Sequence, residues 1–271
     1  MVVVKGREGL ALATDSRRVS VWRDRYLTED DDVKLFSFAA PHNAVGAVLY
    51  GYGHGLRVAA RKIMTFADGF EATLPPEPLP VCEFAGCLGR FLVDGSGFDL
   101  FVLIAAGYDP GASAGRVYVV EHPGRPTPLE HHAGAYGITW GGQRDFCDRL
   151  IQGYDARLGD VLAGVEGAAD VRMAIPLATL TLGETADLAT FLIRTTIDAA
   201  RFITGLRAVG GPVVAATITR ADGLRVVVAR AMPGPTGEWV AVGEPSAAVL
   251  SVPADGIEPA TYTVAQSAAG E

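Results

Sequence analysis

Apolar residues recur along the chain in short runs that are separated by charged or glycine-rich turns. Two of these runs, Val2–Lys5 and Leu10–Thr14, flank the segment Arg7-Glu8-Gly9, and this pattern predicts a β-hairpin. Val33–Phe38 and Ala44–Tyr50 predict two further strands. Because the second of these is almost entirely apolar, we expect it to be covered on both faces. The first part of the chain is therefore predicted to be mostly β-structure.

Hydrophobic positions three and four residues apart mark the predicted helices. These helices cover Leu56–Phe66, Val81–Leu92, Gln143–Tyr154 and Thr181–Thr204. Thr181 and Glu184 have the spacing of a capping box, which predicts the start of the last helix. Further apolar runs predict strands at Leu100–Gly107, Arg116–Val120, Val213–Arg220 and Leu224–Ala229. This order of strands and paired helices favours an α+β sandwich and excludes an alternating βαβ chain.

The length and composition allow one large domain followed by a different C-terminal segment. The chain has 271 residues, of which 49% are hydrophobic, so it can bury a large core. We expect this domain to occupy residues 1–231. Residues 232–271 contain five prolines, five carboxylates and no Lys or Arg. That composition predicts an acidic tail or a peripheral arm.

Charge and hydropathy exclude several classes of partner. The net charge of −8 argues against an extended nucleic-acid surface. Apolar runs such as Leu100–Ala106 are too short to cross a bilayer, so no membrane partner is expected. Lys5 directly follows the N-terminal valines, which is not the design of a signal peptide. The sequence therefore predicts a cytoplasmic protein.

No metal or cofactor is predicted from the residues that could bind one. The three cysteines, Cys82, Cys87 and Cys147, match no metal-binding spacing, and we expect small buried hydrophobes in a reducing compartment. His131 and His132 are adjacent, so on a strand they would point to opposite faces and share no metal. Glu29–Asp32 is a run of carboxylates without further regularly spaced oxygen ligands, which favours a solvated turn over a cation-binding loop.

Three residues carry a resemblance to a known family. Asp15 and Arg17 lie in the segment Ala-Thr-Asp-Ser-Arg, and Lys34 begins Lys-Leu-Phe. In this order, the segments resemble those of proteasome β-type subunits in the N-terminal nucleophile (Ntn) hydrolase superfamily, in its bacterial proteasome-like branch. The segment from Gly210 to Gly223 is similar to the C-terminal hairpin of the same subunits. The resemblance implies a four-layer αββα sandwich.

The resemblance also implies a function and a set of site residues. Members of that family are threonine-type peptidases, which cleave peptide or amide bonds with the hydroxyl of an N-terminal residue. Asp15, Lys34 and Arg17 match family positions at the catalytic site. An ammonium at Lys34 would lower the pKa of the terminal amine, and Asp15 would hold Lys34 in place. Self-association into a ring or another homo-oligomer, with a peptide or protein substrate, is also implied; an ATPase partner is left open.

Several family features have no counterpart in this sequence. The nucleophilic Thr has no match, because the chain starts with Met1 and the family position falls shortly before it. Trp140-Gly141-Gly142 stands where the family has a supporting Ser, and Val209 and Leu206 replace a further Ser and an Asp. Two hypotheses follow: a hydrolase whose true start lies upstream, or a catalytically silent subunit that serves as a scaffold or binding module. In the second, Asp15 and Lys34 form a structural ion pair.

Overall fold

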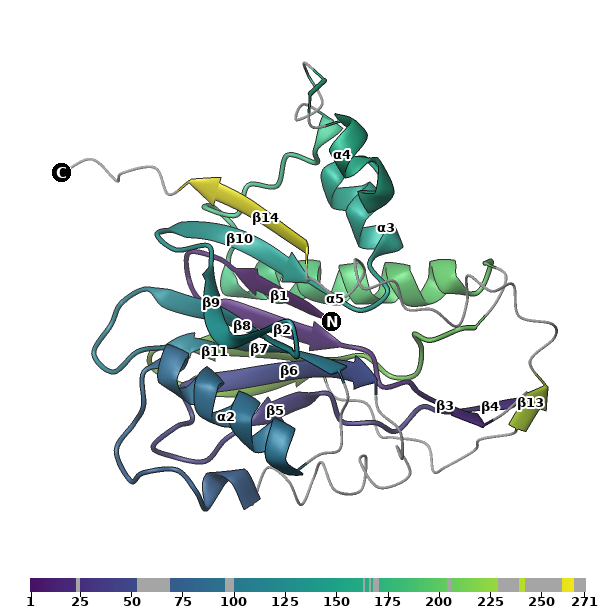
Figure 1. Ribbon diagram of the computed structural model, residues 1–271. Helices are drawn as coiled ribbons and strands as arrows, with labels where there is room; N and C mark the ends of the chain where they lie inside the picture. Colours follow the sequence, from purple (N-terminus) through teal and green to yellow (C-terminus); the bar gives the residue numbers. More distant parts are fainter. Residues whose placement is uncertain are drawn as a thin grey trace.

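The structure is a computed structural model that describes most of the chain. The described residues are 1–22, 25–52, 69–95, 100–162, 164–165, 167, 171–203, 206–228, 239–241 and 260–265. Within these ranges the strands form three antiparallel sheets (Figure 1). Two of the sheets carry the longer helices on their outer faces (Figure 1).

The largest sheet has six strands in the order β12-β11-β2-β1-β10-β14. Its members are β1 (Val2–Lys5), β2 (Leu10–Thr14), β10 (Ala135–Trp140), β11 (Val214–Thr219), β12 (Gly223–Val228) and β14 (Ala260–Ala265). The predicted N-terminal hairpin is confirmed, because Val2 pairs with Ala13 and Lys5 pairs with Leu10. β1 is central, so the start of the chain lies between β2 and β10.

The second sheet has five strands in the order β5-β6-β7-β8-β9. Its members are β5 (Leu35–Ser37), β6 (Val45–Tyr52), β7 (Leu100–Tyr108), β8 (Gly115–His122) and β9 (Arg125–His131). The third sheet is small and has the order β13-β4-β3. It consists of β3 (Arg18–Trp22), β4 (Arg25–Glu29) and β13 (Trp239–Ala241).

Helices cover the two larger sheets. Among the described residues, the longest ones are α2 (Val81–Gly95) and α5 (Leu182–Ala200), and shorter segments are α3 (Asp145–Cys147), η1 (Asp148–Gln152), η2 (Ala156–Leu158) and α4 (Gly159–Leu162). The capping box predicted at the start of α5 is present. Glu184 N donates to the Thr181 hydroxyl at 3.2 Å, and Thr181 N donates to the Glu184 carboxylate at 2.8 Å.

Three hydrophobic clusters of described residues fill the spaces between the layers. Val3, Leu12 and Ile104 belong to the core between the six-stranded and five-stranded sheets. A second core includes Trp140 and residues of α5 on the outer face of the six-stranded sheet. A third core includes Phe84 of α2 on the outer face of the five-stranded sheet. The fold is therefore the predicted α+β class, a four-layer αββα sandwich.

The structure differs from the sequence predictions in several local features. The predicted helix over residues 143–154 begins as α3 and continues as the π-helical turn η1. The predicted helix Leu56–Phe66 lies outside the described residues.

Among the described residues, no helix has the length and apolar character needed to span a membrane.

The C-terminal segment contributes strands to two sheets. β13 pairs with β4 in the small sheet, and β14 pairs with β10 at the edge of the six-stranded sheet. The predicted division of the chain into residues 1–231 and 232–271 stays a prediction. The described part of the second segment is nevertheless built into the sheets of the first.

Candidate functional site

The predicted ion pair between Asp15 and Lys34 is present. Asp15 directly follows β2, and Lys34 directly precedes β5, so the pair joins the ends of strands from the two main sheets. Lys34 Nζ lies 2.8 Å from Asp15 Oδ1, and the side chains are 16% and 7% exposed. A charge pair with so little solvent contact interacts more strongly than one at the surface.

The carboxylate of Asp15 also accepts two backbone hydrogen bonds. Its Oδ2 atom accepts from Arg17 N at 3.1 Å and from Gly210 N at 3.2 Å. Burial alone would raise the pKa of Asp15, but Lys34, the N-terminal amine and the hydrogen bond from Gly210 N together hold the pKa below its ordinary value. Asp15 is therefore an ionised group that joins three separate segments of the chain.

The backbone N–H of Arg17 donates to Asp15, and the guanidinium interacts with the same carboxylate through its charge. The guanidinium itself makes two hydrogen bonds with Asp30, at 2.7 and 2.8 Å. The hydrogen bonds to Asp30 raise the pKa of Arg17. The guanidinium also packs on Gly210, where an added Cβ would lie 2.3 Å from Arg17 Cζ. Glu29 is likewise paired, with Arg18, so the acidic run ending at Asp32 is not simply the solvated turn that the sequence predicted.

The N-terminal amine lies in the same region and is buried. Met1 N donates to Gly141 O at 3.0 Å, and Gly141 N donates to Met1 O at 3.0 Å. Burial lowers the pKa of this amine; the carboxylate of Asp15 opposes that effect, and the ammonium of Lys34 adds to it. The ion pair therefore acts on the charge of the amine.

Tyr50 covers the glycine loop on which the amine rests. A Cβ added to Gly141 would lie 2.7 Å from the Tyr50 ring, so this position can hold only glycine while the ring stays in place. Burial raises the pKa of Tyr50, which keeps its hydroxyl protonated. The site thus has an aromatic wall that the sequence pattern did not indicate.

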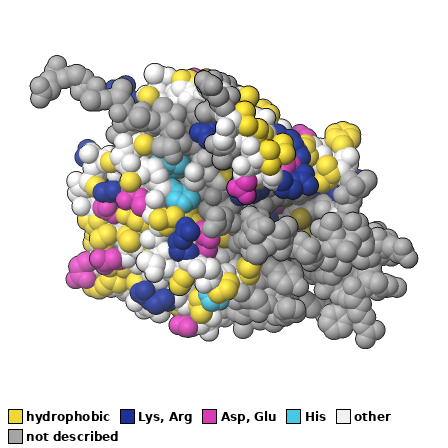
Figure 2. Space-filling model, turned by 45° about the horizontal axis from the view of Figure 1, so that its top comes forward, with side chains coloured by type: hydrophobic (Ala, Val, Ile, Leu, Met, Phe, Trp, Pro, Cys, Tyr) yellow, Lys and Arg dark blue, Asp and Glu magenta, His cyan; other side chains and the backbone are white. Residues whose placement is uncertain are grey.

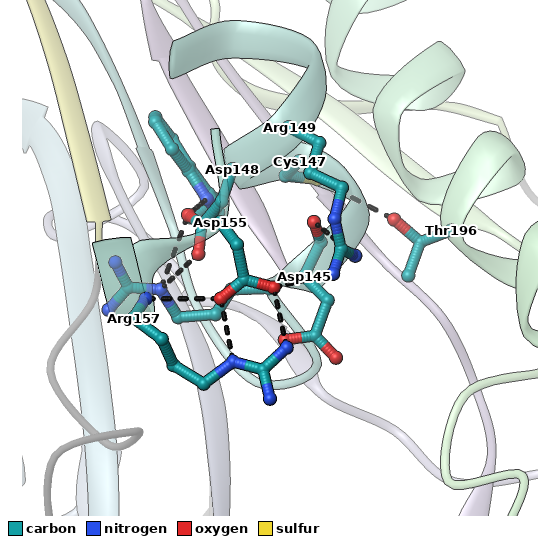
Figure 3. Close-up of polar contacts among 9 residues, drawn as sticks. Asp145, Cys147, Asp148, Arg149, Asp155, Arg157 and Thr196 are labelled. Carbon is teal, nitrogen blue, oxygen red and sulfur yellow. Dashed lines mark hydrogen bonds and ion pairs between the residues drawn. The ribbon is translucent and has the colours of Figure 1, made fainter. Parts of the chain in front are cut away.

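A second polar group lies behind this loop, on α3, η1 and α5 (Figure 3). Cys147 Sγ lies 3.5 Å from the Thr196 hydroxyl, and burial raises the pKa of this thiol. The carboxylate of Asp148 accepts from Trp140 Nε1 at 2.9 Å and pairs with Arg144 at 2.9 Å. These bonds fix the short helical segment against β10.

Arginine side chains surround another carboxylate at the outer end of this segment. Figure 3 shows Asp155 between Arg149 and Arg157, and it forms ion pairs with both. Hydrogen bonds from Arg157, more than any other interaction, hold the pKa of the Asp155 carboxyl below its ordinary range. The carboxylate of Asp155 thus pairs with both guanidiniums, and the three side chains form a structural network.

One further carboxylate, Asp32, lies near the ion pair. Burial raises the pKa of Asp32, while the ammonium of Lys34 opposes that shift. Its Oδ1 atom is buried without a hydrogen-bond partner among the described residues. Its backbone N donates to Ser16 O at 3.0 Å, which ties the acidic run to the end of β2.

Within the described ranges, no three side chains of His, Cys, Asp or Glu gather as a metal site would require. The expected opposite orientation of His131 and His132 is wrong. His131 Nδ1 and His132 Nε2 lie 3.2 and 2.9 Å from the same Thr139 hydroxyl. The chain leaves β9 at His131, and His132 has a φ of 57°, so strand alternation does not apply to it.

Sequence reasoning placed Asp15 and Lys34 together, but it missed most of the surrounding groups. Gly210 and Gly141 act through backbone atoms, which leave no signal in the sequence. All three cysteines were expected to be buried hydrophobes; Cys147 is buried, whereas Cys82 and Cys87 are only partly buried. The position of Cys147 near Met1 follows from tertiary packing and not from any motif.

These layers and strand orders define a proteasome-like fold. No protein-family model matches the chain, and no curated protein matches it. Among solved structures, it is similar to Anbu (ancestral beta-subunit) from Yersinia bercovieri, with 17% sequence identity and a TM-score of 0.51. The match covers 84% of this chain and 86% of that one.

The comparison corrects the family resemblance drawn from the sequence. At this identity, the likeness to Anbu shows the fold alone. The assignment to proteasome β-type subunits, drawn from Asp15, Arg17 and Lys34, is wrong as a statement of membership: the similar solved structure is Anbu, at 17% sequence identity. What holds is a shared architecture.

Proposed function

We propose that this protein is a non-hydrolytic, cytoplasmic subunit with a proteasome-like fold, which assembles with copies of itself as a scaffold or binding module. The observation that carries the proposal is the packing of Tyr50 on Gly141, where an added Cβ would lie 2.7 Å from the ring. The carboxylate of Asp15 is occupied by Lys34, Arg17 N and Gly210 N, which come from three segments. In this proposal the ion pair holds the ends of the strands together and takes no part in bond cleavage.

The surroundings of the ion pair support this reading. Trp140-Gly141-Gly142 offers no hydroxyl where the sequence resemblance implies one, and Tyr50 fills the space above Gly141. Both backbone polar groups of Gly141 are used by Met1. A hydrolytic site needs donors directed at the developing oxyanion, and the N–H of Gly141 already donates to Met1 O.

Exposed apolar side chains support self-association. Phe191 on α5 is 50% exposed, and Phe202, just beyond its end, is 86% exposed. Figure 2 shows hydrophobic side chains reaching the surface beside a group of Lys and Arg side chains. Large exposed apolar side chains are typical of surfaces that contact a partner. The similar Anbu structure is itself named as a beta-subunit.

The test combines an activity assay with a measurement of mass in solution. The full chain and its Lys34→Ala variant are incubated with a panel of fluorogenic peptides and with an unfolded protein. We expect no hydrolysis by either form, and sedimentation should give a species heavier than the 28.4 kDa chain. Hydrolysis that disappears in Lys34→Ala would overturn the non-hydrolytic assignment, and a monomer at micromolar concentration would overturn the assembly.

A second candidate, an amidohydrolase with an N-terminal nucleophile, is favoured by one observation. The pKa of the Met1 amine is lowered by its burial, with a further contribution from Lys34, as a terminal base requires. The amine of such a site activates a hydroxyl or thiol on its own residue. The intact mass of the native protein separates the candidates: a mature chain that begins with Thr, Ser or Cys would support the hydrolase.

A further inference from the structure

The last described strand, β14, occupies the edge of the six-stranded sheet. Among the described strands it is hydrogen-bonded to β10 alone. The register runs from Ala135 opposite Ala265 to Trp140 opposite Ala260. Figure 1 shows β14 beyond β10, at the edge of the sheet. A single antiparallel ladder therefore connects this segment to the sheet.

β10 needs a neighbour on this side. Its residues Ile138 and Trp140 are completely buried and belong to the core under α5. If β14 were absent, the outward N–H and C=O groups of β10 would lose their hydrogen-bond partners. The edge of β10 is thus a site that binds an extended chain mainly through backbone hydrogen bonds.

The sequence of β14 suits a segment that pairs readily with such an edge. It reads Ala-Thr-Tyr-Thr-Val-Ala, with no charge, proline or glycine. Thr, Tyr and Val favour extended structure, and the features that normally protect an edge strand from pairing are missing. Neither the composition nor the ladder restricts β14 to the β10 strand of its own chain.

The connection to β14 is long enough to reach another molecule. β13 ends at Ala241 in the small sheet, and residues 242–259 lead to Ala260. When extended, such a segment spans up to about 60 Å. A folded chain of this length has a radius of gyration of about 18 Å. The connection can therefore place β14 on the β10 strand of an adjacent copy.

We propose that β14 is exchanged between copies, so that residues 260–265 of one molecule pair with β10 of the next. This inference rests on the self-association proposed above and is independent of whether the protein hydrolyses anything. Exchange of an identical element is a low-cost route to an oligomer, because each copy makes the same contacts that it would make internally. The C-terminal segment adds β13 and β14 at the edges of two sheets, which suits it to such an exchange.

Engineered cysteines at a directly opposed pair test the exchange in the full chain. One protein carries Ala135→Cys and a second, with a different tag, carries Ala265→Cys; both also carry Cys82→Ser and Cys87→Ser, which remove the two partly exposed native thiols. The two are co-expressed and oxidised. Opposed residues of an antiparallel ladder are close enough for a disulfide. We expect a covalent heterodimer by intact mass, and none when Ala221→Cys, in an exposed turn away from the ladder, replaces Ala265→Cys.

A single chain with both Ala135→Cys and Ala265→Cys tests whether β14 pairs with β10 within one molecule. If it closes an internal disulfide while the mixed single variants give no heterodimer, exchange is overturned. If neither arrangement forms a disulfide, the ladder itself is absent, and the proposal also fails. Sedimentation of the same samples separates the two proposals: an oligomer without interchain disulfides leaves self-association standing and removes strand exchange, whereas a monomer removes both.

Discussion

The ammonium of Lys5 lies 2.7 Å from the carbonyl oxygen of His132, at the end of β1 remote from Met1. The imidazole of His132 contacts the Thr139 hydroxyl, which His131 also contacts. Burial lowers the pKa of His131 to about 4 and that of His132 to about 3. Both imidazoles are therefore neutral near neutral pH, and the buried ammonium has no charged imidazole beside it.

This arrangement predicts a loss of stability in mild acid. The ordinary histidine pKa of 6.5 applies to the unfolded chain, whereas the pKa values in the folded protein are about 4 and about 3. As the pH falls below 6.5, the unfolded state takes up protons first, so the free energy of unfolding decreases until the folded pKa values are reached. Urea denaturation at a series of pH values measures this decrease.

His132→Asn tests whether the titration comes from this group. Asn tolerates the positive φ of 57° and cannot titrate in this range. We expect the variant to lose less stability than the native chain between neutral pH and pH about 5. An equal loss in both proteins would show that other groups account for the acid sensitivity.

Gly137→Ala should destabilise the protein by steric overlap with His132. The added Cβ would lie 2.1 Å from His132 Nδ1, so the imidazole would have to leave its contact with Thr139. Overpacking of this kind costs about 1–3 kcal/mol, which thermal or urea unfolding would detect. Gly159→Ala is the matched control: a Cβ there meets nothing within 4 Å, so stability should not fall. Equal effects of the two substitutions would contradict the prediction.

Lys34→Met should destabilise the protein strongly, because it leaves the buried carboxylate of Asp15 without its cation. Breaking one side of a buried pair costs about 3–5 kcal/mol. The double variant Asp15→Asn/Lys34→Met should lose less than the sum of the two single variants. A double-mutant cycle measured by urea unfolding gives the coupling, and additive effects would show that the pair contributes nothing as a unit.

The lowered pKa of Asp15 sets the pH range in which this pair matters. Because the carboxyl holds its proton less tightly in the folded state, its contribution to stability is present above the ordinary pKa of 3.8 and is lost as the pH falls through the lower folded value. The Asp15→Asn/Lys34→Met variant should therefore show a smaller decrease in stability in strong acid. A decrease of the same size in both proteins would exclude Asp15 as its source.

Thr181→Ala should weaken α5 by removing the capping box. Loss of an N-cap side chain costs about 1 kcal/mol. Thr179→Ala provides a control of the same residue type, because Thr179 is exposed and its hydroxyl only donates to Pro176 O at 3.1 Å. Hydrogen exchange of the first turn of α5 should increase in the first variant and stay unchanged in the second. Faster exchange in both would point to a general loosening of the segment.

The sequence predicted features that depend on local pattern. The hairpin from Val2 to Thr14 follows from two apolar runs around a turn, and α5 follows from its spacing and cap. The proximity of Asp15 and Lys34 came from resemblance to other proteins, since the two residues lie on separate elements. Their role at the site, like that of Arg17, stays a prediction.

Other features depend on contacts that no local pattern encodes. The pairing of the Arg17 guanidinium with Asp30 depends on the folded geometry of the segment that connects them. The convergence of His131 and His132 depends on one residue of left-handed backbone after β9. The sequence pattern did not predict β14, because this strand lies in a proline-containing segment. Its pairing partner lies more than a hundred residues earlier in the chain.

The π-helical turn η1, at Asp148–Gln152, bears on how this chain should be aligned with its relatives. A π turn accommodates one more residue than the α-helix that would otherwise fill the same space. Deleting a single residue from it should restore a regular helix and rotate the residues before the deletion by about 100° relative to those after it. Asp148 would then no longer face the Trp140 indole. In relatives that lack this turn, we expect a one-residue gap within these five positions.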